Sequence, residues 1–241
     1  MSYLKTTAIQ HLNGSSPNIY LDANTNVGIG TSSPGYKLDV SASSFVAASV
    51  STSFSGAGNI RIADSTTTSA SAPYIGSVGN NLAFGRIGTA EYMRIDSNGY
   101  VTKPYTPIFS GVRSGYGWES YPSASVWIAN LSLVNNGNCY NTSNGLFTCP
   151  VTGYYKISAG ILIGKADSAT AYGYMMYAKN GAYSTFLNHL NGSSGSVWAT
   201  ISYNITVSAS VNDTLAVGLV TVNGNAAYGD SHGYVNIELV T

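Results

Sequence analysis

Few residues of this chain have the chemistry of a catalyst. Its 241 residues include three histidines (His11, His189 and His232), ten acidic side chains and two cysteines. No histidine stands beside an obvious nucleophile or in a metalloprotease motif. The acids of the C-terminal half are scattered, whereas glycoside cleavage needs two carboxyl groups at a defined separation. The sequence predicts no enzyme and no cofactor, although a carboxylate pair formed between subunits stays open.

Two short motifs have residue types found in sites for charged ligands. In "GDSHG", Asp230 and His232 are two residues apart, so on a strand they would share a face and could bind a cation. We favour a solvent-exposed loop there, and the presence of a metal is left undecided. "GIGTSSPG" is not a phosphate-binding loop, because no lysine follows at the required position.

The two cysteines, Cys139 and Cys149, lie ten residues apart across a predicted hairpin. They could face each other and pair, but assembly in a cytosol favours two buried free thiols. With no histidine nearby, they do not form a zinc site.

Charge is scarce and balanced. Charged residues make up 8% of the chain, against about 25% in ordinary soluble domains, and ten basic residues offset ten acidic ones. A neutral chain lacks the electrostatic footprint of a nucleic-acid or anionic-lipid partner. We find no apolar run of signal-peptide length and none near the roughly 20 residues of a membrane span. We therefore expect assembly in a cytoplasm, without membrane insertion.

The elements that must position any site are strands. Helix-forming residues are scarce, and β-branched residues, Tyr and Ser dominate between Gly-containing turns, which predicts an all-β chain. "VWATISYNITVSASV" (197–211) alternates between apolar and polar residues, as a half-buried strand does. "TLAVGLVTV" (214–222) is apolar on both parities, which predicts a strand covered on both sides. Asn180-Gly181 is a strong hairpin signal.

The first hundred residues contain a weak repeat. "IYLDANTNVGIG" (19–30) and "MRIDSNGYVTKP" (93–104) both read apolar-x-Asp, then an Asn-containing turn, then Val. Each is a small hairpin with too little apolar surface to bury alone. Copies from several chains could share a core, with Gly28 and Gly30 letting their backbones approach. The alternative is a plain flexible loop. The segment 41–73 is read as a small β module rather than a linker.

The same N-terminal stretches carry a resemblance. "NIYLDANTNVGIGTSSPGYKLDV" and "YMRIDSNGYV" resemble motifs of bacteriophage tail fibres and related virion proteins, where they lie in shaft or attachment regions ahead of a C-terminal head.

From Pro107 onward the chain resembles the complement-type globular head of the tumour-necrosis-factor-like jelly rolls. The matching stretches are "PIFSGVRS", "NGNCYNTSNGLFTCPVTGYYKISAGI", "MMYAKNG" and "GYVNIELV", with anchors at Phe109, 136–140, 145–148, 150–154, 179–181 and 233–234. The resemblance implies a ten-strand, two-sheet sandwich that trimerises about a three-fold axis. "GKADSATAYG" and "NGNAAYGDSHG" fit no family pattern, so no receptor or metal residue is carried over.

The resulting prediction is an all-β, homotrimeric phage fibre protein. It comprises an attachment or shaft segment (1–43), a small β module or shaft (44–103) and a two-sheet jelly-roll head (104–241). The N-terminal region would dock on other virion or tail proteins, and the head would bind a host surface glycan or outer-membrane protein. The alternatives are a head or neck decoration fibre without a receptor, a glycan-degrading tailspike and a non-viral complement-like lectin.

Receptor contacts are predicted at the tip of the head. If the C-terminus returns to the shaft end, alternate loops cluster at the opposite tip: 164–173, 189–196 and 223–233. Aromatic and short polar side chains there suit sugars and uneven protein surfaces. The predicted contact residues are Tyr228, Asp230, His232, Asn191, Asp167, Tyr172 and, on a side surface, Trp118. The alternative is that these loops are merely solvated. Trp127 is predicted to lie in the core or an interface.

Overall fold

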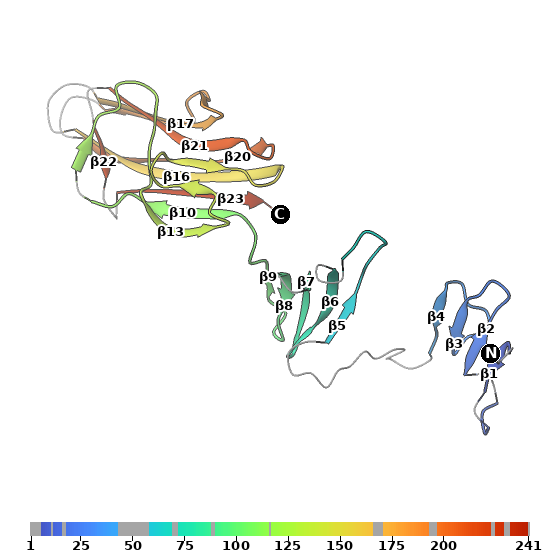
Figure 1. Cartoon of the computed structure of the whole chain (residues 1–241). Coiled ribbons are helices and arrows are strands. Elements are labelled where there is room, and N and C mark those ends of the chain that lie inside the picture. The colour runs from blue at the N-terminus through green and yellow to red at the C-terminus, as the bar shows by residue number, and fades with distance from the viewer. Residues whose placement is uncertain are drawn as a thin grey trace. The chain divides into compact units, whose positions relative to one another are not determined.

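The computed structural model contains only strands and turns among the residues it describes (Figure 1). These are residues 6–10, 12–15, 18–42, 58–68, 72–87, 90–115, 117–165, 171–192, 197–222, 225–228 and 232–240. The chain divides into two compact units, Met1–Val101 and Thr102–Thr241, which are described separately. The all-β class is confirmed; the three-part division at 43/44 and 103/104 stays a prediction.

Two small sheets account for the N-terminal unit. The first has four strands in chain order, β1 (Ala8–Ile9), β2 (Ile19–Leu21), β3 (Val27–Ile29) and β4 (Leu38–Val40), the last pair being parallel. The second is an antiparallel meander of β5 (Gly58–Arg61), β6 (Pro73–Val78), β7 (Asn81–Arg86), β8 (Ala90–Ile95) and β9 (Val101–Thr102).

The sequence repeat forms the same turn twice. The carboxylate of Asp22 accepts hydrogen bonds from the amides of Asn24 and Asn26, both at 2.8 Å. The carboxylate of Asp96 accepts them from the amides of Asn98 and Tyr100, at 2.8 and 2.9 Å. Since Asp bonds to the backbone just ahead of it, each turn is held locally and needs no packed core.

The close approach at Gly28 and Gly30 occurs within one chain. A Cβ at Gly28 would lie 2.3 Å from the carbonyl oxygen of Thr31, and one at Gly30 would lie 2.1 Å from that of Ser41. Gly30 also has a φ of +74°, a conformation that side chains disfavour. The chain's own backbone therefore explains both glycines, without the neighbouring chains that the sequence suggested.

The C-terminal unit is a two-sheet jelly-roll sandwich. One sheet has the order β11-β22-β16-β23-β10-β13, with β20 also paired to β16, and the other has the order β14-β15-β21-β17-β18, with β12 on β21 and β19 on β17. Their bounds are β10 (Ile108–Val112), β11 (Gly117–Glu119), β12 (Ser125–Val126), β13 (Leu131–Asn136), β14 (Tyr140–Asn141), β15 (Leu146–Thr148), β16 (Gly153–Lys165), β17 (Ala171–Lys179), β18 (Ala182–Tyr183), β19 (Asn188–Gly192), β20 (Val197–Ala209), β21 (Thr214–Val222), β22 (Asn225–Tyr228) and β23 (Gly233–Val240).

A single apolar core lies between the two sheets. Its largest fully buried side chains include Trp127, Tyr155, Phe109 and Phe147. The ring of Phe109 stacks on that of Tyr140 with centroids 3.6 Å apart, and the hydroxyl of Tyr140 accepts a hydrogen bond from the Ala129 amide. The prediction that Trp127 lies in the core or an interface is confirmed for the core.

Strand patterns in this unit match the sequence. In β20, Ile201, Tyr203, Val207 and Ala209 are buried, whereas Thr200, Ser202, Asn204, Thr206 and Ser208 are exposed. In β21, residues 215–219 are all buried, so coverage on both sides is confirmed. The second covering layer comes from this chain itself, because a Cβ at Gly218 would meet Met176 and the ring of Tyr183.

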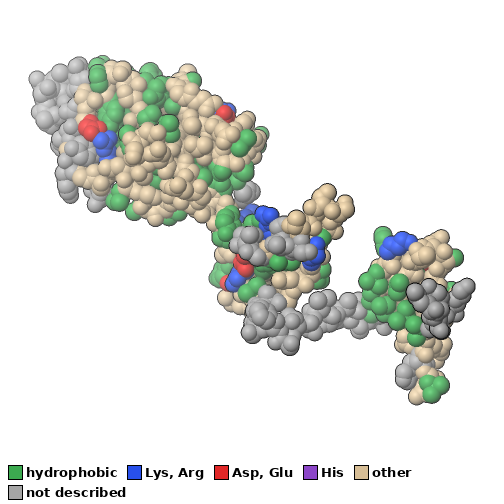
Figure 2. Space-filling model, viewed as in Figure 1, with side chains coloured by type: hydrophobic (Ala, Val, Ile, Leu, Met, Phe, Trp, Pro, Cys, Tyr) green, Lys and Arg blue, Asp and Glu red, His purple; other side chains and the backbone are tan. Residues whose placement is uncertain are grey.

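The surface of the sandwich carries few charges on the face shown in Figure 2. One charged group does anchor a turn. The carboxylate of Asp213 accepts hydrogen bonds from the amide of Ser210 and the side chain of Asn180, both at 2.8 Å, and lies 3.0 Å from Nζ of Lys179. Asn180 and Gly181 have φ values of 52° and 77°, which confirms the predicted hairpin turn.

We expect Asp213→Asn to lower the urea midpoint of unfolding at neutral pH but not near pH 2. The hydrogen bonds from Asn180 and Ser210 and the ammonium of Lys179 lower the pKa of Asp213 from 3.8 to about 2. Its carboxylate therefore stabilises the fold fully above the ordinary pKa, and this stabilisation is lost as pH falls through the folded value. Urea titrations from pH 7 to pH 2 measure the difference.

Glu238→Gln is the matched control, because its carboxylate lies 3.4 Å from Lys156 in an exposed pair. If the urea midpoints of Asp213→Asn and the unaltered protein differ by the same amount at every pH, the carboxylate of Asp213 is not the source of this stabilisation.

Candidate functional site

Strand register fixes which end of the sandwich faces away from the chain's entry. Ile108, where β10 begins, pairs with Glu238, and Tyr154 pairs with Val240, so the chain enters and leaves at one end. The opposite end, which we call the far end, carries the end of β16, the start of β17, the end of β19 and the end of β21. Residues paired there include Tyr172 with Asn191 and with Val222.

The fold brings five of the predicted receptor residues to the far end. Tyr172 and Asn191 are directly paired across β17 and β19. Trp118 and Tyr228 belong to the paired strands β11 and β22, in which Gly117 pairs with Tyr228 and Trp118 with Ala227. The carbonyl of His232 accepts a hydrogen bond from the Leu162 amide at 2.8 Å.

Two predicted contact residues, Asp167 and Asp230, lie outside the described residues, so the solvent-exposed loop expected at 229–233 stays a prediction and its alternative, a cation-binding Asp230–His232 pair, stays open. For Trp118, Asn191 and Tyr228 the structure describes the backbone position only.

All three of the predicted loops contain strand residues, contrary to the expectation from the sequence. The loop 164–173 includes the end of β16 and the start of β17, where Tyr172 lies. Asn191 lies in β19 and Tyr228 lies in β22. Both segments pair with a neighbouring strand through backbone hydrogen bonds, although neither has a long apolar pattern. Their sequences, rich in Asn, Gly and Ala, read as loops because the pairing comes from the neighbours rather than from local propensity.

An aromatic row runs from the far end along the outer side of β17. Tyr172 and Tyr174 have near-parallel rings with centroids 6.3 Å apart. Phe186 stacks on Tyr174 at 4.4 Å, and His189, the strand partner of Tyr174, lies 6.1 Å from it. We call Tyr172, Tyr174, Phe186 and His189 the aromatic row.

The aromatic row faces away from the core. Gly173, between its two tyrosines, points at Ile163 of the opposite sheet, so Tyr172 and Tyr174 point outward. Phe186 is 59% exposed, which is unusual for a phenylalanine. No member is Asp, Glu, Lys or Arg, so the row suits an uncharged surface. Sequence reasoning found Tyr172 alone; Tyr174, Phe186 and His189 come together only through the pairing of β17 with β19.

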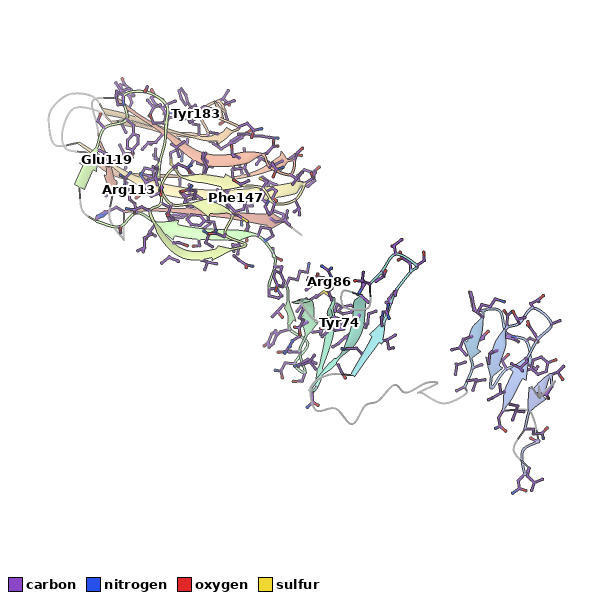
Figure 3. All side chains as sticks on the ribbon, viewed as in Figure 1. Tyr74, Arg86, Arg113, Glu119, Phe147 and Tyr183 are labelled. Carbon is purple, nitrogen blue, oxygen red and sulfur yellow. The ribbon has the colours of Figure 1, made fainter. Side chains whose placement is uncertain are left out.

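A charged network fixes the segment that carries Trp118. The guanidinium of Arg113 binds the carboxylate of Glu119, and Figure 3 shows where these two residues lie. The same guanidinium donates a hydrogen bond to the hydroxyl of Tyr121 at 2.8 Å. That hydroxyl donates to the other carboxylate oxygen of Glu119 at 2.6 Å. Burial, and then this bond to Glu119, raise the pKa of Tyr121, so the phenol stays protonated. The network holds β11 in place at the far end.

The cysteines do not provide a nucleophile. Cys139 and Cys149 are free and buried in the core. Burial raises the pKa of Cys149 to about 11 and that of Cys139 above its usual value, whereas a reactive cysteine needs a lowered pKa. The sequence left open a disulfide or two free thiols, and the structure has two free thiols.

Among the described residues, no three His, Cys, Asp or Glu side chains gather as metal ligands would. The described part of the chain likewise contains no helix with the length and apolarity to cross a membrane.

Comparison with known proteins gives similarity in fold alone. No protein-family model matches the chain, and no curated protein matches it. Two solved structures similar to it are the globular domain of zebrafish complement 1qA protein (15% identity, TM-score 0.42) and murine APRIL at pH 5.0 (10% identity, TM-score 0.42). Each match covers 56% of this chain, with 98% of the zebrafish chain and 99% of the murine chain. The jelly-roll assignment rests on the strand order and the shared core described above.

We expect the two thiols to resist a water-soluble thiol reagent in the native protein at pH 8 and to react together once the chain is unfolded in guanidinium chloride. Burial keeps both thiols protonated and out of reach. The measurement is the colour released by a disulfide reagent, with the unfolded protein as the reference for two thiols per chain. Rapid release of colour by the native protein would show that solvent reaches the core near β14 and β15.

Proposed function

We propose that this chain is a structural protein of a phage virion, a trimeric tail fibre whose C-terminal head binds the host cell surface. The observation that carries the proposal is the outward-facing aromatic row, which starts at the far end of the sandwich with Tyr172 and includes the exposed side chains of Phe186 and His189. The N-terminal sequences that resemble phage tail fibres support the virion assignment. The protein would be assembled in the host cytoplasm and act in the virion.

The mechanism is binding without turnover. Tyrosine and phenylalanine provide large, stiff contact surfaces at low entropic cost, and stacked rings lose little freedom when a ligand covers them. Tyr172, Tyr174 and Phe186 would supply this surface. His189, the fourth member of the row, and Asn191, the strand partner of Tyr172, would supply hydrogen-bonding groups. The ligand is a host surface glycan or an outer-membrane protein. Three heads on one fibre add multivalency, so weak single contacts become durable attachment.

We expect Tyr174→Ala combined with Phe186→Ala to weaken binding of the full chain to host envelope by at least about tenfold, since stacked aromatic side chains are typical anchors of binding sites. Saturation binding of labelled protein to intact host cells measures the change. Tyr154→Ala is the matched control: Tyr154 is 64% exposed but lies at the end where the chain enters. Unchanged binding by the double variant, with a normal thermal midpoint, would exclude the aromatic row.

The same binding assay separates the alternatives. A decoration fibre would not bind host envelope saturably, and a glycan-degrading spike would release reducing ends from host polysaccharide. Either outcome would replace the proposal.

We expect a native mass near three times the chain mass of 25.1 kDa, which falls to one chain in denaturant. The physical reason is that the described residues of the N-terminal unit bury no Val, Ile, Leu, Met or aromatic side chain, so this unit needs a partner to stabilise it. Native mass spectrometry in dilute neutral buffer gives the result. A well-folded single chain under these conditions would contradict the fibre assignment.

A further inference from the structure

The five-stranded sheet β5–β9 has two chemically different faces. Directly paired residues of adjacent strands share a face. One row across four strands consists of Ile60, Ile75, Phe84 and Met93, and the next row on the same face ends in Leu82 and Ile95. We call these six residues the apolar face.

The opposite face is polar. Its rows contain Asn59, Gly76, Ala83 and Arg94, then Arg61, Tyr74, Gly85 and Glu91, and then Val78 and Asn81, so Val78 is the large aliphatic residue on this face. Arg94 forms an ion pair with Glu91 at 2.6 Å there. Among the described residues of the sheet, the register assigns one charged side chain, Arg86, to the apolar face, and it lies in the last row. An antiparallel sheet with this asymmetry normally packs its apolar face and solvates the other.

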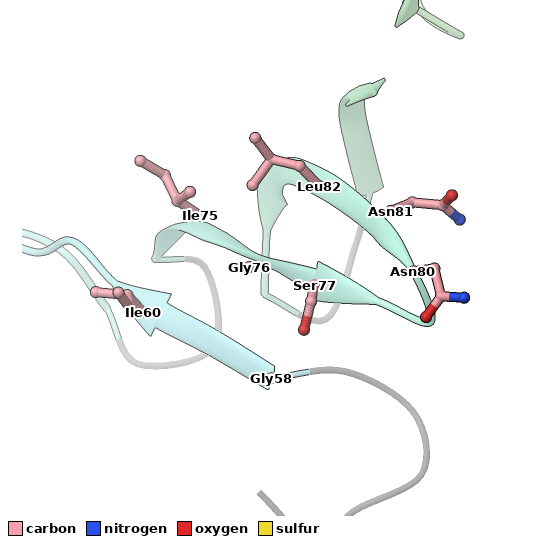
Figure 4. Close-up of a pocket in the computed structure, with 8 residues that line it drawn as sticks. All are labelled: Gly58, Ile60, Ile75, Gly76, Ser77, Asn80, Asn81 and Leu82. Atoms are coloured by element: carbon pink, nitrogen blue, oxygen red, sulfur yellow. The ribbon is translucent and has the colours of Figure 1, made fainter. Parts of the chain in front are cut away.

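Half of the apolar face is left open: Phe84, Met93 and Ile95 are partly buried, whereas the other three residues are exposed. Ile60, Ile75 and Leu82 are 54%, 37% and 42% exposed. They line an open pocket of about 510 Å³ with Asn80 and Asn81, and Figure 4 shows Ile75 and Leu82 projecting to the same side of the sheet.

The described residues of the N-terminal unit form no apolar core that could compensate. Among its described residues, the fully buried hydrophobic side chains are Ala72 and Ala83; no Val, Ile, Leu, Met or aromatic side chain is buried. The C-terminal unit buries Trp127, Tyr155, Phe109 and many more. A small sheet in water needs a packed face to be stable.

We propose that the apolar face of β5–β9 packs against the apolar face of other copies of this chain. Among the described residues of the sheet, most large apolar side chains lie on this face, so a partner should be present whenever the sheet folds, and an identical chain meets that requirement. The face is almost uncharged, so identical copies meet without repulsion, whereas a different partner of a transient complex usually contributes complementary charge.

This inference deepens the proposed fibre function and rests on its self-association, because it names the surface through which copies meet. Neither the repeat nor the glycines of the N-terminal sequence indicate these contact residues.

The test replaces Ile75 with the photo-crosslinking residue p-benzoylphenylalanine in the full chain, which captures whatever lies on the face. Equal amounts of isotopically heavy and light chains are co-assembled, irradiated and digested. We expect cross-linked peptides that join a heavy chain to a light one, at residues 58–62, 82–84 or 93–95. The denatured product should run near twice the 25.1 kDa chain mass.

Tyr74→p-benzoylphenylalanine is the matched control, since Tyr74 is adjacent in sequence and faces the polar side; it should give no such product. Ile75→Cys with a short bismaleimide is the second variant, in case the larger residue perturbs the sheet. Cross-links of Ile75 within one chain, to residues 43–57 or to the C-terminal unit, would overturn the proposal, as would no cross-link from either variant. If the native mass remains three chains and host binding persists, the proposed function would survive that failure.

Discussion

Strand β16 is the element on which the C-terminal unit depends. Its thirteen residues pair with β20 along their whole length and with β23 over eight positions, so one strand aligns most of a sheet. Its inward side chains, Tyr155, Ile157, Ala159, Ile161 and Ile163, are fully buried and meet the other sheet. Burial of each large aliphatic side chain contributes about 1.5–3 kcal/mol, which makes this strand the centre of the core. Strand β16 begins at the end where the chain enters and finishes at the far end, so it also connects the two ends of the sandwich.

The sequence predicted most of the sandwich because its signals are local and periodic. The alternation in 197–211 and the two-sided apolar run in 214–222 follow directly from burial, and Asn180-Gly181 has the backbone that its turn requires. The clustering of Tyr172 and Asn191 could be expected from counting antiparallel strands. The aromatic row could not, because Tyr174, Phe186 and His189 are brought together by a strand, β19, whose sequence has no strand pattern.

In the described part of the N-terminal unit, hydrogen bonds between residues close in sequence determine the structure, whereas the C-terminal unit depends on a packed core. Asp22 and Asp96 hold their turns through hydrogen bonds to neighbouring amides, and Gly28 and Gly30 fit the backbone of their own chain. These features specify shape without a buried interior. The sequence correctly indicated hairpins poor in apolar surface, but the asymmetry of β5–β9 depends on cross-strand register, which a single strand's pattern does not fix.

Entry and exit at one end of the sandwich have a practical consequence for protein engineering. Because β10 begins beside the end of β23, both covalent connections of the head lie on the same side. The C-terminal unit is therefore suited to transfer as a cassette onto an unrelated protein, and a fluorophore or enzyme fused after the last strand would leave the opposite surface unobstructed.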